Sequence, residues 1–177
     1  MTVHGRAVPN VVGVDIGCGM YTLRLGTQKI DFEKVDEAAP FITSGRNVWE
    51  KPVEPFDFES LRCYGELKKK QWLACSLGTL GGGNHFIEVA KDEAGVHYLL
   101  VHTGSRYVGA KVANWHQKRA VELLQREDLA GKIEALKQEG RAKEIQAMIQ
   151  QFKNANPVVP KDLAYLQGES FRDYIAD

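Results

Sequence analysis

A β-hairpin in the middle of the chain is the feature that most constrains its fold. Residues 86–90 and 96–101 are rich in β-branched and aromatic side chains, and residues 92–95 form a polar break of hairpin length between them. Folding about the middle of that break pairs Lys91 with Val96 and His85 with His102. Directly opposed strand residues have Cβ atoms roughly 4.5–5.5 Å apart. The two imidazoles are therefore predicted to lie close enough to share a metal ion or to bind two neighbouring ions.

A second candidate cluster lies near the N-terminus. Residues 11–16 and 21–25 are predicted strands, and the turn between them contains Gly17 and Gly19. Glycine adopts backbone angles that other residues resist, so this turn can aim Asp15 and Cys18 at one point. Carboxylate, thiolate and imidazole together suit Zn, Mn, Fe or Co, and residue types alone favour zinc. Ordinary packing of the cysteine and turn capping by the aspartate remain the structural alternatives.

Two glycine-containing loops flank the histidine pair. The run at 80–84 could cradle a phosphate through backbone N–H groups, although it lacks the lysine of a P-loop. The segment at 103–106 adds hydroxyls and a guanidinium, which makes Ser105 and Arg106 candidates for contacts to phosphate or RNA. An ordinary polar loop is equally compatible with these residues.

The charge balance excludes a polycation that coats nucleic acid indiscriminately. Lys and Arg number 23, as do Asp and Glu, in 177 residues. A local basic groove built by Arg106, Lys111 and Arg119 stays possible. The three cysteines are an odd number and are expected to be reduced. With no membrane-length apolar run and no signal peptide at the start of the sequence, a cytoplasmic protein without a membrane partner is expected.

The expected fold class is α+β, with mixed or antiparallel strands around a metal site and helices after about residue 110. The 177 residues are expected to form one domain. Further helices are predicted at 59–71, after Gly140 and after Gly168, and residues 128–160 read as a helical insertion.

Three motifs in this order resemble the RtcB family of RNA ligases. They are VGVDIGCGM at 12–20, SLGTLGGGNHFIE at 76–88 and HTGSR at 102–106, and DLAYL at 162–166 fits more loosely. The resemblance implies an enzyme that joins RNA 3′-phosphate or 2′,3′-cyclic phosphate ends to 5′-hydroxyl ends. It further implies GTP and two Mn²⁺ ions as cofactors, and tRNA halves or broken RNA as substrates in splicing and repair.

Site residues are implied by the same resemblance. The implied metal ligands are Asp15, Cys18, His85 and His102. The implied nucleotide contacts are Asn84, His85, Phe86, Ile87 and Glu88. On a regular strand Glu88 would face away from His85, so either the strand distorts near the glycines or Glu88 reaches a different part of the nucleotide.

The resemblance covers only the middle of the family's fold. The family's third metal histidine and its guanylylated histidine lie outside the matching motifs, and no histidine follows His116. This chain alone is therefore expected to lack the catalytic nucleophile, to ligate nothing, and to self-associate through surface that a complete fold would cover. A non-catalytic metal- or RNA-binding remnant or regulator is the alternative, and a metal-dependent phosphatase is a third.

Overall fold

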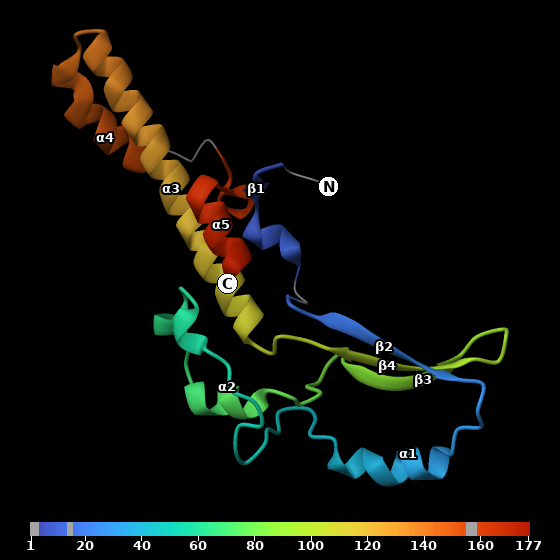
Figure 1. Cartoon of the computed structure of the whole chain (residues 1–177). Coiled ribbons are helices and arrows are strands. Elements are labelled where there is room, and N and C mark those ends of the chain that lie inside the picture. The colour runs from blue at the N-terminus through green and yellow to red at the C-terminus, as the bar shows by residue number, and fades with distance from the viewer. Residues whose placement is uncertain (1–3, 14–15, 155–158) are drawn as a thin grey trace. The chain divides into compact units, whose positions relative to one another are not determined.

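The computed structural model describes residues 4–13, 16–154 and 159–177, and its fold class is α+β as predicted (Figure 1). The described chain divides into two compact units. One, here called the sheet unit, is Val14–Lys111, and the other, the helical unit, combines Met1–Gly13 with Val112–Asp177. The prediction of a single domain stays a prediction.

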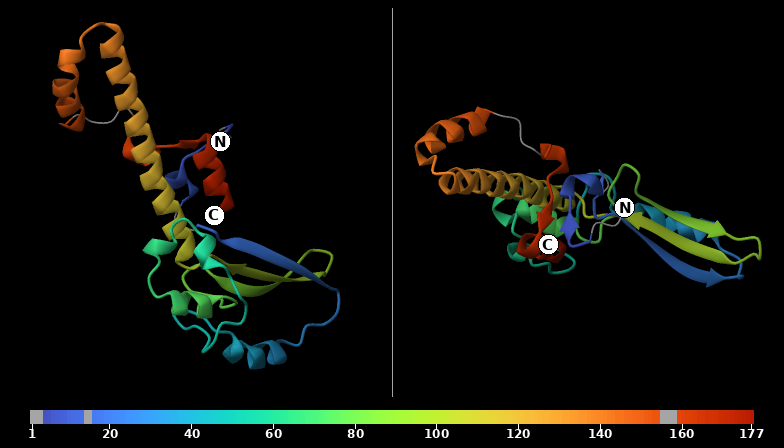
Figure 2. Two further views of the ribbon diagram at one scale, coloured as in Figure 1. Left: turned by 60° about the vertical axis from the view of Figure 1, so that its left-hand side comes forward. Right: turned by 90° about the horizontal axis from the view of Figure 1, so that it is seen from above.

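The sheet unit contains a three-stranded antiparallel sheet, whose strands run side by side in both views of Figure 2. Its strands are β2 (Gly19–Gly26), β3 (Phe86–Lys91) and β4 (His97–Thr103), in the order β2-β4-β3. The predicted hairpin and the predicted strand at 21–25 are thus confirmed. The central strand, β4, carries the second histidine of the pair, and β3 begins directly after the first.

The predicted hairpin register is wrong by one residue. His102 lies opposite Phe86, not His85, and Lys91 lies opposite His97. Val96 belongs to the loop, where its side chain is buried. Its carbonyl accepts a hydrogen bond from the Asp92 amide, and its amide donates to the Asp92 carboxylate. The Val96 amide also keeps the pKa of the Asp92 carboxyl below its ordinary value, because it donates to that carboxylate at 2.8 Å.

The shift in register changes which side chains share a face of the sheet. Opposed residues lie on one face, and a slip of one residue moves a whole strand's side chains to the other face. His102 lies opposite both Phe86 and Met20, and Leu100 lies opposite Glu88. Glu88 therefore shares a face with His102, which the predicted register did not allow.

The predicted strand at 11–16 is wrong where the structure describes it. A 3₁₀ helix, η1, spans Pro9–Val12, with the Val11 amide donating to the Val8 carbonyl at 3.1 Å. Proline at the first helical position favours this turn, and Val11 is 66% exposed, so the apolar run is not a buried strand. Strand β1 is only Arg6–Ala7, which pairs with β5 (Leu166–Gln167) within the helical unit.

Two short helices complete the sheet unit, α1 (Phe32–Ala38) and α2 (Lys70–Ser76). The helix predicted at 59–71 is wrong, because that stretch forms 3₁₀ turns, at Phe58–Ser60 and Tyr64–Glu66, before α2 begins at Lys70. Lys69, which has a left-handed backbone (φ 54°), directly precedes α2 and separates it from the turn at Tyr64–Glu66. The core of this region is made of Leu61, Cys63, Leu67, Leu73 and Cys75.

The long helix α3 (Val108–Gln138) leads into the helical unit, where α4 (Ile145–Asn154) and α5 (Gly168–Ala176) follow. The predicted helices after Gly140 and after Gly168 are confirmed. Here Ala120, Ala164 and Leu166 form a small core. His116, 1% exposed, donates from Nε2 to Asp177 Oδ2 at 2.8 Å.

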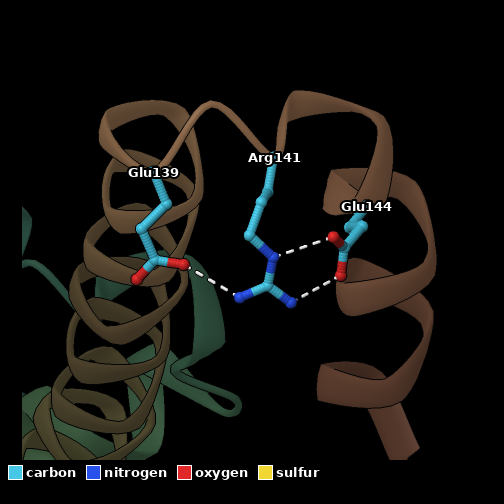
Figure 3. Close-up of polar contacts among 3 residues, drawn as sticks. All are labelled: Glu139, Arg141 and Glu144. Atoms are coloured by element: carbon cyan, nitrogen blue, oxygen red, sulfur yellow. Dashed lines mark hydrogen bonds and ion pairs between the residues drawn. The ribbon is translucent and has the colours of Figure 1, made fainter.

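The turn between α3 and α4 is held by one guanidinium, drawn in Figure 3. Arg141 donates through Nε and Nη2 to both carboxylate oxygens of Glu144, and through Nη1 to Glu139 Oε2 at 2.8 Å. These bonds, that to Glu144 foremost, raise the pKa of Arg141 and lower that of Glu144. All three side chains are exposed, so the contacts set the geometry of the turn more than its stability.

Large apolar side chains stay exposed in the sheet unit. They include Met20, Tyr21, Leu23, Phe32 and Phe41. Such surface is typical of an interface that another chain or segment covers, and the predicted self-association stays a prediction. None of the helices among the described residues is both long and apolar enough to cross a bilayer.

Candidate metal and nucleotide site

A thiol and an imidazole meet where the first glycine turn approaches the start of β3. Cys18 Sγ lies 3.3 Å from His85 Nε2, although 67 positions separate them in the chain. Both side chains are partly buried. The sequence predicted that the early glycine turn and the hairpin would meet, and Cys18 and His85 do so.

A backbone carbonyl fixes the orientation of the His85 ring. Nδ1 of His85 lies 2.8 Å from the Leu80 carbonyl oxygen, which also accepts a hydrogen bond from Thr103 Oγ1 at 2.9 Å. A carbonyl oxygen only accepts, so Nδ1 must carry the proton and, in the neutral ring, Nε2 keeps its lone pair. That lone pair faces the Cys18 thiol, which is how a backbone carbonyl prepares a histidine to bind a metal.

Two glycines leave the room that this contact needs. A Cβ at Gly104 would overlap Cys18 Sγ and lie 3.2 Å from His85 Nε2. A Cβ at Gly81, where φ is +86°, would overlap both the His85 ring and the Arg106 guanidinium. Glycine is thus required at both positions because the side chains come so close to the backbone.

His102 stands beside this pair on the central strand. Its ring centroid lies 5.5 Å from that of His85 and 5.4 Å from that of Phe86, in edge-on arrangements. The glycine loop, rather than strand pairing, brings the two histidines together, since His85 precedes β3 and is not opposite His102. His97 lies on the other face of β4, as the alternation of strand side chains predicts.

The fourth predicted ligand, Asp15, lies outside the described residues. Within the ranges that the structure describes, no three His, Cys, Asp or Glu side chains are grouped to hold one ion. The geometry therefore offers a thiol–imidazole pair with a second imidazole adjacent. Its donor types fit a borderline divalent cation such as zinc or manganese.

The predicted nucleotide residues divide between the two faces of the sheet. Phe86 and Glu88 share the face of His102, whereas Ile87 points to the opposite face, where it lines a hollow of about 370 Å³ with Val101. Asn84 is exposed in the loop before β3.

Ser105 and Arg106 have structural partners that the sequence does not reveal. The Ser105 hydroxyl donates to the Ile16 carbonyl at 2.6 Å and accepts from the Gly109 amide at 3.1 Å. Arg106, with a left-handed backbone (φ 58°), donates from Nη2 to the Gly45 carbonyl at 2.7 Å. Its Nε is buried without a hydrogen-bond partner among the described residues, and its Nη1 lies close to the Gly81 backbone and the His85 ring.

The chain is similar in sequence to a known family and to proteins of Escherichia coli. The family model described as tRNA-splicing ligase RtcB matches residues 60–177. The chain is 33% identical over 150 residues to RNA-splicing ligase RtcB of Escherichia coli K12, and equally to RNA-splicing ligase RtcB1 of strain ATCC 25922. RNA-splicing ligase RtcB2 of the latter strain is 30% identical over 129 residues, which are 63% of this chain and 31% of that protein. The first two matches cover 70% of this chain and 35% of each relative, so the chain spans about a third of their length.

Proposed function

The chain belongs to the RtcB family of tRNA-splicing ligases, and on that premise we propose that it carries part of an RNA-ligase site that uses Mn²⁺ and GTP. The reaction would join RNA 3′-phosphate or 2′,3′-cyclic phosphate ends to 5′-hydroxyl ends. The contact of 3.3 Å between Cys18 Sγ and His85 Nε2 is the observation that carries the proposal.

The residues of this chain would act chiefly by holding and orienting. Cys18 and His85 would bind metal together, with His102 and Asp15 as further ligands. When bound, Mn²⁺ would neutralise phosphate charge and acidify the attacking hydroxyl. The Leu80 carbonyl keeps the His85 Nε2 lone pair directed at Cys18. The Arg106 guanidinium lies close to the His85 ring, which supports a role in binding the phosphate.

The nucleotide would lie along the face of the sheet that carries Glu88. That side chain is exposed and on the side of His102, so it is able to contact a ligand near the metal without a distorted strand. Phe86 offers a ring edge next to His102 on the same face.

Titration with Mn²⁺ tests the metal site. Substitutions Cys18→Ser, His85→Gln and His102→Gln each remove a proposed ligand, so each is expected to weaken binding at least as much as loss of a residue that orients a ligand, which costs about 10–100-fold. His97→Gln is the matched control, because His97 lies on the same strand as His102 but on the opposite face. Equal affinity in all four variants, or no binding by the wild-type chain, would contradict the proposal.

A chimaera tests the ligase itself. This chain replaces the aligned segment of the E. coli K12 relative, and RNA with 2′,3′-cyclic phosphate and 5′-hydroxyl ends is the substrate. Joined product that disappears with Cys18→Ala is expected. A folded chimaera that binds Mn²⁺ but joins nothing would favour the non-catalytic alternative, and released phosphate without joining would favour a phosphatase.

The guanylylation step is tested on the chain by itself. Because no histidine follows His116, incubation with Mn²⁺ and labelled GTP is expected to leave no covalent adduct. An adduct on these residues would refute the assignment of the nucleophile to a histidine outside them.

A further inference from the structure

Two segments of the sheet unit meet on a surface that adjoins the candidate metal site at Arg106. The Lys68 backbone amide donates to the Tyr107 hydroxyl at 3.2 Å across 39 positions of sequence. The Arg106 guanidinium lies 5.6 Å from the centre of the Trp72 ring. The segment around α2 and the segment that leads into α3 therefore form one continuous surface.

Three cations lie against aromatic rings on this surface. Lys70 Nζ lies 3.4 Å from the Tyr64 ring centroid, and Lys111 Nζ lies 5.4 Å from that of Tyr107. Each pair, like that of Arg106 and Trp72, is within the range of a cation–π contact. We call the set the basic–aromatic surface: Tyr64, Lys68, Lys69, Lys70, Trp72, Arg106, Tyr107 and Lys111.

The positive charge of this surface is local. Residues 59–72 and 106–111 contain six Lys or Arg and two acidic residues, whereas the whole chain has 23 of each sign. Lys68, Lys69 and Lys70 are all exposed. Of the three basic residues predicted to form a groove, Arg106 and Lys111 lie in the sheet unit, and Arg119 belongs to the helical unit.

Two residues of this surface have an unusual backbone conformation. Lys69 and Arg106 are the two non-glycine residues with a left-handed backbone in the part of the chain that the structure describes. Glycine adopts that conformation without strain, yet both positions carry a long basic side chain. Unfavourable backbone conformations of this kind are concentrated at binding sites.

We propose that the basic–aromatic surface binds single-stranded RNA, and that it leads the strand toward the candidate metal site through Arg106. Proteins that bind single strands without sequence preference use two kinds of side chain: cations that contact the phosphate backbone of the nucleic acid, and aromatic rings on which its bases stack. Arg106 belongs to both places, since its guanidinium contacts Trp72 and also lies beside Gly81 and His85. The inference rests on the proposed function for its choice of ligand.

Fluorescence anisotropy with a labelled RNA of roughly 12 nucleotides, a length that suits one such surface, tests the inference. Measurements in EDTA and without GTP separate RNA binding from metal binding and ligation, so either proposal can fail alone. The test variant is Lys68→Gln/Lys69→Gln/Lys70→Gln. The control, Lys29→Gln/Lys51→Gln/Lys91→Gln, removes the same charge from exposed positions of the same unit outside the surface.

Salt dependence gives the expected size of the effect. Each phosphate contact to a single strand adds about 0.7 to the slope of log affinity against log salt, so loss of three contacts lowers the slope by about 2. Between 50 and 200 mM salt the wild type is then expected to lose about 20-fold more affinity than the test variant. The control should keep the wild-type slope.

A stacking variant provides a second measurement. Tyr64→Leu is expected to weaken binding while leaving the salt slope unchanged, and circular dichroism checks that each variant folds. Equal slopes in the test and control variants, no binding by the wild type at 50 mM salt, or equal competition by duplex RNA would each overturn the proposal.

Discussion

Replacing Gly104 by alanine is the sharpest test of the close contact at the candidate site. The new Cβ would overlap Cys18 Sγ and stand 3.2 Å from both Cys18 Cα and His85 Nε2. The thiol must therefore move, and overpacking of this kind costs about 1–3 kcal/mol. With a urea m-value of about 1–3 kcal/mol/M, the unfolding midpoint should fall by roughly 1 M. Because the thiol and imidazole separate, Mn²⁺ affinity should fall as well, by about 10-fold or more.

Gly19→Ala is the matched control for this substitution. Gly19 begins β2 opposite Thr103, and a Cβ there meets nothing within 4 Å. Alanine at such a position leaves stability unchanged or raises it by about 0.4–1 kcal/mol. If Gly104→Ala unfolds at the wild-type urea concentration and binds Mn²⁺ as tightly as Gly19→Ala, the close approach of the three residues is refuted.

Three further predictions concern the rest of the fold. Leu166→Ala removes a fully buried side chain from the helical unit and should cost about 2–5 kcal/mol in urea unfolding; a loss below 1 kcal/mol would speak against that core. Asp177→Ala leaves His116 Nε2 buried without its carboxylate, so a loss of about 1–3 kcal/mol is expected by the same assay. For Asp92 the folded pKa is lowered, so its stabilising effect on the hairpin is present above the ordinary value of 3.8 and is lost as pH falls through the folded pKa. In the wild type, hydrogen exchange of the Val96 amide, corrected for intrinsic exchange, should therefore speed up as the pH falls through the folded pKa of Asp92. In Asp92→Ala the corrected exchange rate should not change over that range.

Local patterns in the sequence were enough to predict the hairpin and the late helices. Alternating β-branched residues around a polar break predict β3 and β4, and glycine at 140 and 168 predicts the starts of α4 and α5. Each of these patterns involves only residues that are close together in the sequence. The elements can therefore be predicted without knowing how the chain folds. The helix predicted at 59–71 is wrong because that stretch forms two 3₁₀ turns, and the left-handed Lys69 then separates them from α2. Composition does not reveal either feature.

The register shows the limit of local reasoning at the site. Counting from the middle of the polar break placed Val96 in the strand, but burial of its side chain and the bond of its amide to Asp92 keep it in the loop. One residue of difference moved Glu88 to the face of His102. No count along the chain could reveal this, because the loop is fixed by packing and by a side chain's hydrogen bond.

The sequence by itself determined which chemical groups are available: a thiol in a glycine turn, two histidines beside glycine loops, and the motifs that identify the family. Only the tertiary structure decided that Cys18 meets His85, that the Leu80 carbonyl orients the ring, and that lysines near α2 join the residues before α3. The physical reason is that side-chain type is a local property. Contact between residues 67 or 39 positions apart depends instead on how the intervening chain packs. For Cys18 and His85 it also depends on Gly104, whose missing Cβ lets the two side chains approach.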